Sequence, residues 1–307
     1  MTRRVGWSGF TLVEVMVALV LLGMVSVVLY QTLISTQRVT DALHQRGAMQ
    51  SGLRAGGLTV PGELQQLTIG RSSTLDSISD ISDITDTSIT YRAMRGFYVV
   101  CEAPASATTL TVVRVQPSPF TSEYRSPLST DSAFVFWEGD TLAIDDDTWI
   151  PVGISAVATA TCSYPSSPAA AKAAYTIGLA GSGIPAAFPL SKLYPGAPVR
   201  TFESDQLVLY ASGGAEWLGI GVNGGAAQPV LGPLAPTTGT VHGFQLSYYD
   251  STGAALTAAS ASIPKVRTIG VMLRGVTSAQ VAAAGRSRAM IYDSLLAVVT
   301  LRNAPRN

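Results

Sequence analysis

Glu14 is the residue whose position most clearly demands a chemical role in this 307-residue chain. It is the one charged residue in an apolar run that extends from Phe10 to Tyr30. An unneutralised carboxylate inside a membrane costs several kcal/mol, so an acid in such a segment is by default functional. The chemistry that it offers is ion pairing. A single buried charge that finds a cationic partner can fix the register of a neighbouring helix.

A second group with chemical potential is the acidic triplet Asp145-Asp146-Asp147. Carboxylate oxygens at these positions, with one more from a residue such as Asp140, could bind Ca²⁺. Adjacent residues of an extended chain point to opposite faces, however, so the triplet alone cannot form a cage. A solvated acidic turn is the favoured reading, and calcium binding is the alternative.

The remaining candidates do not form a catalytic set. The two histidines, His44 and His242, are not spaced as metal ligands. The sequence suggests no Ser-His-Asp or Cys-His set that would include either of them. Gly219 to Gly224 satisfies G-x-G-x-x-G, but no helix follows that could hold a pyrophosphate, so we predict a strand end and a turn. We therefore predict that the chain is not an enzyme and needs no cofactor, and rank an anchored enzyme last among its functions.

The element that positions Glu14 is predicted to be a long helix. Twenty apolar residues suffice to span a bilayer, and a basic leader with Arg3 and Arg4 precedes them. Apolar residues keep helical spacing to about Leu53. Gly56-Gly57 and Pro61-Gly62 are then expected to interrupt the helix before a short continuation. We divide the chain into a leader (1–9), a transmembrane segment (10–30), an extracytoplasmic helix (31–67) and a β-rich head (68–307).

The segment Gly9-Phe10-Thr11-Leu12-Val13-Glu14 resembles the class III signal of type IV prepilins and type II secretion pseudopilins. An ordinary secretory signal is cut after its apolar segment, whereas this motif places the cut before it. The resemblance implies that a membrane prepilin peptidase cuts after Gly9 and methylates the new terminus at Phe10. It also implies that Glu14 acts in filament assembly. A plain membrane anchor that happens to contain a glutamate is the alternative.

Beyond the helix, short strand patterns separated by Gly, Pro and Ser clusters predict antiparallel sheet, and hence an α+β, pilin-like fold. The proline-rich stretch Pro185–Pro198 is expected to be a linker or long surface loop and a candidate subdomain border. Leu295–Leu301 is apolar on both faces, which predicts a central or doubly covered strand. The order of Val241–Asp250, Val266–Val271 and Val299–Asn303 resembles the heads of PilW-like minor pilins and of minor pseudopilin J.

Cys101 and Cys162 are the two cysteines, and both lie in strand-like segments. In an oxidising compartment an even pair favours a disulfide, with two buried thiols as the alternative. Closing this loop of about 60 residues would contribute about 4 kcal/mol in the chain-entropy model.

Zero net charge and the lack of a basic cluster argue against nucleic acid as the main partner. The resemblance implies instead a filament subunit, a minor pilin or pseudopilin involved in initiation or tip assembly. Its partners would be prepilin peptidase, other minor and major pilins, the inner-membrane assembly platform and the membrane itself. It would be a single-pass inner-membrane protein with its head in the periplasm or outside the cell. The same anchor displaying an adhesin or ligand-binding module, with tryptophans such as Trp137, Trp149 and Trp217 on its surface, is the alternative.

Overall fold

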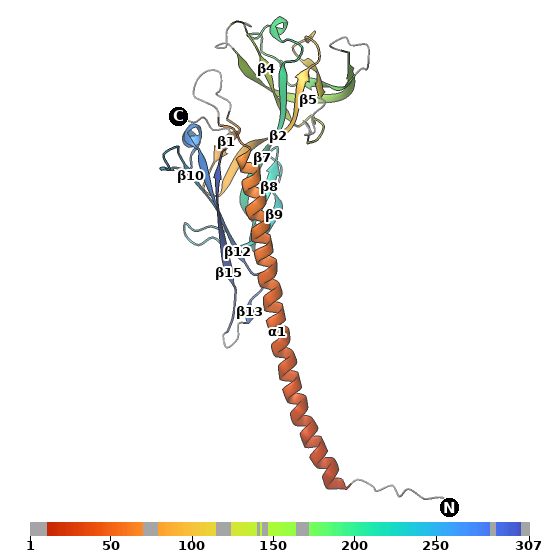
Figure 1. Ribbon diagram of the computed structural model, residues 1–307, viewed down its shortest axis with the longest axis vertical. Coiled ribbons are helices and arrows are strands. Elements are labelled where there is room, and N and C mark those ends of the chain that lie inside the picture. Colours follow the sequence, from red (N-terminus) through yellow and green to blue (C-terminus); the bar gives the residue numbers. More distant parts are fainter. Residues whose placement is uncertain are drawn as a thin grey trace, which may run out of the picture.

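The computed structural model describes residues 11–69, 79–114, 124–139, 142, 147–163, 172–282 and 287–301. A long helix, α1 (Leu12–Gln65), is followed by antiparallel β-structure. The N-terminal part of α1 projects as a bare stalk, while its C-terminal part lies against the strands (Figure 1). The expected fold, a long N-terminal helix packed on antiparallel sheet, is confirmed.

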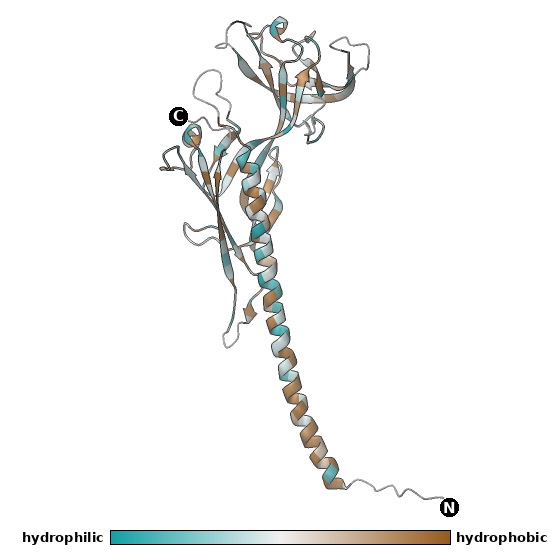
Figure 2. Cartoon of the chain, in the orientation of Figure 1, coloured by the Kyte–Doolittle hydropathy of each residue, from teal (hydrophilic) through white to brown (hydrophobic). Residues whose placement is uncertain are grey.

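The 54 residues of α1 form a helix about 80 Å long. Its buried residues, Leu53, Gly56, Val60 and Leu64, recur every three or four positions and therefore share one face. Figure 2 shows that the stalk is predominantly hydrophobic, whereas polar and apolar residues alternate along the part that meets the head. The sequence of α1 thus changes from a segment that is apolar all round to an amphipathic one.

The expected interruption of the helix at Gly56-Gly57 and Pro61-Gly62 is wrong, because α1 continues through all four residues. Gly56 faces the head so closely that an added Cβ would lie 2.6 Å from a terminal carbon of Leu231 and 3.1 Å from one of Leu273. The glycine therefore allows close packing. Pro61 removes one helical hydrogen bond, but the burial of Val60 and Leu64 on either side holds the helix against the head.

Part of the sheet packs against α1, and we call it the helix-packed region. Its first group of paired strands is β1 (Ile81–Ile84), the N-terminal part of β2 (Ser88–Val100), the C-terminal part of β7 (Pro198–Ser212), β8 (Ala215–Val222) and β9 (Gln228–Leu234). Its second group is β11 (Ala255–Leu256), β10 (Phe244–Tyr249), β12 (Thr268–Val276) and β15 (Tyr292–Thr300). A single residue pair, Gly275 with Leu234, joins the two groups.

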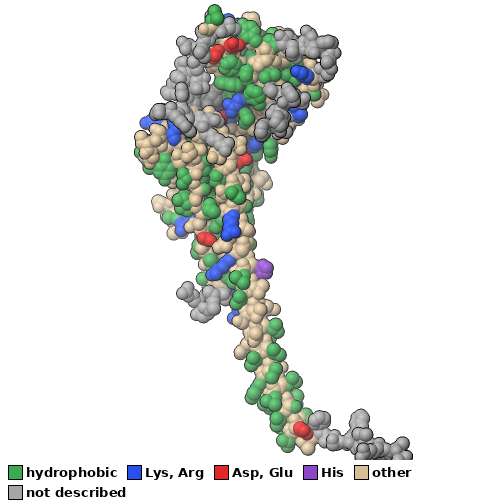
Figure 3. Space-filling view, viewed as in Figure 1, with side chains coloured by type: hydrophobic (Ala, Val, Ile, Leu, Met, Phe, Trp, Pro, Cys, Tyr) green, Lys and Arg blue, Asp and Glu red, His purple; other side chains and the backbone are tan. Residues whose placement is uncertain are grey.

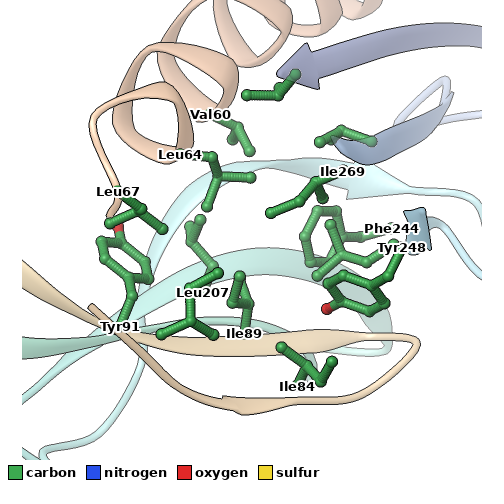
Figure 4. Close-up of a cluster of buried hydrophobic side chains, with 14 of the residues drawn as sticks. Val60, Leu64, Leu67, Ile84, Ile89, Tyr91, Leu207, Phe244, Tyr248 and Ile269 are labelled. Carbon is green, nitrogen blue, oxygen red and sulfur yellow. The ribbon is translucent and has the colours of Figure 1, made fainter. Parts of the chain in front are cut away.

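The core of the helix-packed region lies between these two groups of strands and the end of α1. Figure 4 shows Val60, Leu64 and Leu67 converging on Ile269, Phe244 and Tyr248 from one group and on Leu207, Ile89, Tyr91 and Ile84 from the other. Each side chain labelled in Figure 4 is at most 3% exposed. The last turns of α1 are therefore an integral part of the core.

The rest of the sheet closes on itself as a six-stranded antiparallel barrel. The order of pairing around the ring is β2, β3 (Thr109–Arg114), β6 (Lys172–Leu179), β5 (Thr148–Cys162), β4 (Ser132–Trp137), β7 and back to β2. The barrel has its own core, which includes Tyr98, Leu110, Ile150, Ile177 and Val199. The head therefore contains two separate cores, and only β2 and β7 contribute to both parts.

The segment Pro185–Pro198 does not mark the border between the two parts. It contains a short 3₁₀-helix, η1 (Leu190–Lys192), and packs Leu193 into the barrel core. The border lies instead along β2 and β7, where a β-bulge between Met94 and Gly96 interrupts their register. The proline-rich composition of this segment thus correctly predicted irregular backbone, but it did not predict where the segment lies in the fold.

The expectation that Leu295–Leu301 is a central or doubly covered strand is wrong. Among the described strands, β15 pairs only with β12 and forms the edge of its group. Its inner face is covered by α1, and Leu295 lies against Gly57. On the outer face Leu296 and Val298 are 63% and 67% exposed, so the apolar pattern on both faces does not reflect burial within the chain.

Candidate functional site

The N-terminus of α1 is built around Thr11 and Glu14. Thr11 is the N-cap, and its Oγ1 accepts a hydrogen bond from the Glu14 backbone N–H at 3.3 Å. The Thr11 backbone N–H in turn donates to Glu14 Oε2 at 3.5 Å, which completes a capping box. The pair satisfies two backbone donors that a helix start otherwise leaves open. Gly9 and Phe10 lie outside the described residues.

This capping box is a role of Glu14 that our reading of the sequence missed. The signal was present, because Thr11-Leu12-Val13-Glu14 has the T-x-x-E spacing of a capping box. A carboxylate at the first turn also interacts favourably with the helix dipole. At 3.5 Å the bond from the Thr11 N–H is at the limit of hydrogen-bond length, so it leaves the carboxylate free to accept a stronger donor.

The stalk that follows Glu14 is long and apolar enough to cross a membrane. No charged residue occurs from Val15 to Gln37, a length of about 34 Å in a helix, close to the ~30 Å of a bilayer core. None of its most apolar stretch is buried by the rest of the chain. Figure 3 shows hydrophobic side chains over the surface of the stalk. A solvent-exposed surface of this kind requires a lipid or protein environment.

The family model "Prokaryotic N-terminal methylation motif" matches residues 8–30. This chain carries an N-terminal methylation motif. The match covers Gly9, Phe10, Glu14 and the apolar segment together, and with the long helix it is consistent with a type IV pilin or pseudopilin. No curated protein and no solved structure gives a significant match to the chain. The motif and the exposed apolar helix fit a processed, membrane-anchored protein of the pilin type.

The disulfide expected between Cys101 and Cys162 is present. Cys101 directly follows β2, and Cys162 is the last residue of β5, two barrel strands that are not neighbours. The bridge closes one end of the barrel together with Val113 and Ala174, with which both cysteines form a small buried cluster. Its position indicates a structural role.

The acidic triplet is only partly visible, since Asp145 and Asp146 lie outside the described residues, as does Asp140. Asp147 is half-buried, and its Oδ1 is buried without a hydrogen-bond partner in the described part of the chain. No group of three His, Cys, Asp or Glu side chains that could hold a metal occurs among the described residues. Calcium binding by the triplet therefore remains a hypothesis.

The tryptophans have mainly structural environments. Trp137 is buried and donates its Nε1–H to the Pro189 carbonyl at 3.2 Å. Trp217 donates to the Ser212 carbonyl at 3.1 Å and packs directly against Gly232. Trp149 is half-buried, in edge contact with Phe136 and beneath the guanidinium of Arg200. Of the three, Trp149 and Trp217 are half-buried, whereas Trp137 is buried.

An ionic cluster at the border between the barrel and the helix-packed region was not found from the sequence. Arg95 from β2 binds Glu203 and Asp205 from β7, the latter at 2.7 Å. Arg125 binds Asp131 through two parallel hydrogen bonds of 2.6 and 2.7 Å and also reaches Glu203. Glu203 thus links both arginines. We call these five residues the border cluster, and it ties the loop before β4 to the two strands that both parts share.

Within the border cluster, the Asp205 carboxylate is incompletely satisfied. Its side chain is 3% exposed, and Oδ1 has no hydrogen-bond partner in the described structure. Burial, assisted by the neighbouring Glu203 charge, raises the pKa of Asp205 to about 6, and Arg95 opposes this rise. No short sequence motif links these positions, which explains why sequence reasoning missed them.

Proposed function

We propose that this chain is a minor pilin or pseudopilin, a structural subunit of a type IV pilus or type II secretion filament. The observation that carries the proposal is the methylation motif at residues 8–30, followed directly by an exposed apolar helix. In this proposal prepilin peptidase cuts between Gly9 and Phe10, and Phe10 becomes the methylated N-terminus. Before assembly the chain is a single-pass inner-membrane protein with its head in the periplasm.

Glu14 is proposed to direct assembly through the N-terminal amine of a neighbouring subunit. The Thr11 N–H is its one backbone donor in the described structure, at the long distance of 3.5 Å. An ammonium group from a neighbour would form a shorter, charge-assisted bond and neutralise the carboxylate within the low-dielectric filament core. The capping role in the isolated chain and the pairing role in the filament are therefore compatible.

The shape of the head favours a place at or near the filament tip. The barrel lies beyond the C-terminal end of α1 and to one side of its axis (Figure 1). In a filament whose parallel helices are staggered along its axis, the space above the end of each helix is occupied by the heads of subunits nearer the tip. A subunit at the end of the filament has no such neighbour, so initiation or tip assembly with other pilins and the assembly platform suits this head.

The first test is the N-terminal mass of the membrane-extracted protein, produced with and without a prepilin peptidase. We expect a terminus at Phe10, methylated, that appears only with the peptidase. An intact leader, or a cut after the apolar helix, would remove the filament proposal.

A second test concerns Glu14 directly. Glu14→Ala should leave processing at Phe10 intact but reduce copurification with the filament subunits. Thr11→Val is the matched control, because it removes the cap hydroxyl but keeps the carboxylate. Equal losses in both variants would indicate that helix capping, rather than charge pairing, explains the defect.

A membrane-anchored adhesin or ligand-binding module is the second candidate. The specific observation in its favour is the barrel, which has its own core and presents Trp149 and Phe136 side by side with ring centroids 5.3 Å apart. Loss of ligand or surface binding in Trp149→Ala, with filament incorporation unchanged, would favour this function.

A further inference from the structure

An open cavity of about 470 Å³ lies where α1 leaves the head. One wall is a single face of the helix, formed by Arg38, Asp41, Gln45 and Ala48 at helical spacing, with His44 beside them. The other wall is residues 278–280 and the first residue of each strand in the hairpin of β13 (Val281–Ala282) and β14 (Arg288–Ala289). Figure 3 shows basic side chains in this region, at the upper end of the apolar stalk.

The two walls are held together by a direct contact. Ser278 donates its hydroxyl to Gln45 Oε1 at 2.7 Å, and both residues line the cavity. A second bond, from Gln50 Nε2 to Asp293 Oδ2 at 3.2 Å, ties the next turn of α1 to β15. The cavity is therefore a built feature of the junction between helix and strands.

The level of the cavity relative to a membrane follows from the charge pattern of α1. Arg38 is the first charged residue after Glu14, and Leu33 and Ile34 are the last strongly apolar residues before it. Arg38 lies four residues, or about 6 Å, beyond Ile34. The polar headgroup layer of a bilayer is of the same order, about 5–8 Å on each side. With α1 inserted in the membrane, Arg38 lies at the level of lipid phosphates.

The charges in the cavity match a particular ligand chemistry. Arg38 and Arg288 contribute two guanidinium groups, and neither forms an ion pair within the described residues. Arginine is well suited to phosphate because its planar fork can donate two parallel hydrogen bonds. Asp41 adds one carboxylate to the same cavity. Two cations and one anion complement a group that carries both a phosphate and an ammonium.

We propose that this cavity binds the headgroup of a zwitterionic, ethanolamine-type phospholipid. Arg38 and Arg288 hold the phosphodiester, and Asp41 accepts the ammonium. The bound lipid fixes the height and rotation of the head above the membrane before the subunit enters a filament. This inference rests on the membrane insertion of α1 that the proposed function includes.

The test uses the full-length processed chain, reconstituted in nanodiscs with equal parts of phosphatidylethanolamine, phosphatidylcholine and phosphatidylglycerol. Native mass spectrometry of the released protein then measures which lipids stay bound. We expect phosphatidylethanolamine to be retained most strongly. The double variant R38Q/R288Q should retain it at least roughly tenfold less, because two charge-assisted hydrogen-bonding groups are lost.

Two further variants make the assignment specific. Asp41→Asn should keep phospholipid binding but lose the preference for phosphatidylethanolamine over phosphatidylglycerol. Arg46→Gln is the matched control, since Arg46 lies two turns above Arg38 on the same helix, is exposed and does not line the cavity. Its lipid retention should equal that of the unaltered chain. Equal loss in R46Q and R38Q/R288Q would overturn the proposal, as it would indicate general attraction of basic residues to the bilayer.

Competition separates a lipid headgroup from free phosphate. Excess glycerophosphoethanolamine should displace the retained lipid, while the same concentration of inorganic phosphate should displace much less. Equal displacement by both would assign the cavity to free phosphate and refute the lipid proposal. The N-terminal mass of the same samples keeps the two proposals apart: an unprocessed chain that still retains lipid contradicts the proposed function only.

Discussion

Replacing Gly56 by alanine provides a sharp test of how α1 is held against the head. Alanine favours a helix over glycine by about 1 kcal/mol, so an alanine at an open helical position should stabilise the protein. At Gly56, however, the new methyl group would lie 2.6 Å from Leu231 and 3.1 Å from Leu273. Leu273 is fully buried, so the methyl group fits only if Leu273 and Leu231, which lines a cavity of about 90 Å³, both shift. Overpacking of this kind costs about 1–3 kcal/mol.

The two effects together predict that Gly56→Ala lowers the free energy of unfolding by about 1 kcal/mol. Gly62→Ala, in the same helix, should raise it by about 0.5–1 kcal/mol, because no atom lies within 4 Å of its added Cβ. Gly57→Ala should fall between the two, since it meets only Leu295, which is partly exposed and can move.

Urea unfolding of the processed, detergent-solubilised chain, which lacks Trp7, measures these differences through the fluorescence of Trp217 in the helix-packed region. Variants in which Trp137 and Trp149 are replaced by phenylalanine remove the barrel signal. If Gly56→Ala stabilises the protein as much as Gly62→Ala, the close approach of α1 to Leu231 and Leu273 is not what determines its packing.

Three other predictions concern the barrel and the border cluster. Cys101→Ser with Cys162→Ser should destabilise the barrel by about 4 kcal/mol, because the bridge spans 61 residues, and thermal unfolding under non-reducing conditions measures this loss. Arg125→Met should cost about 3 kcal/mol in urea unfolding by leaving buried Asp131 unpaired, and a smaller effect would place that carboxylate in water. The folded pKa of Asp205, about 6, exceeds the unfolded value of 3.8, so the folded state binds its proton more tightly. The contribution of this residue to stability should therefore grow as the pH falls from about 6 to 4, and Asp205→Asn should abolish this trend in the melting temperature.

The parts of the structure that could be predicted from the sequence are those governed by local patterns. The apolar run and its single acid predict the stalk, and alternating residues predict strands such as β12, whose buried Ile269, Val271 and Leu273 share one face. The turn after β8 was also predicted, and Asn223 and Gly224 both adopt positive φ there. In each case neighbouring residues contain the whole signal.

The missed features depend on residues far apart in the sequence. Gly56 is compatible with a helix end and with a helix interior, and only the position of Leu231 and Leu273 decides between them. The border cluster joins Arg95 to Glu203, more than 100 residues away. The closure of the barrel likewise depends on the pairing of β2 with β7, which no local pattern specifies.

The separation of the two cores implies that the barrel can be removed. Every residue of the barrel core lies between Gly96 and Thr201, and no residue of the other core does. Gly96 and Thr201 are paired across β2 and β7, so replacing residues 97–200 by Asn-Gly should close the strands with a two-residue hairpin turn. Arg95 would still pair with Asp205, since both lie outside the deletion.

We expect the shortened chain to keep α1 packed on the helix-packed region and to unfold cooperatively in urea. In the matched control, Asn-Gly replaces residues 97–199, so that Arg200 is retained. The extra residue shifts the register of β7 by one residue, which turns its buried side chains outward. This control should aggregate or unfold at lower urea. If both deletions fail equally, the barrel is required for folding of the region below it, and the two cores are not independent. If only the control fails, filament incorporation of the shortened chain can be measured, and any remaining defect in assembly then belongs to the barrel.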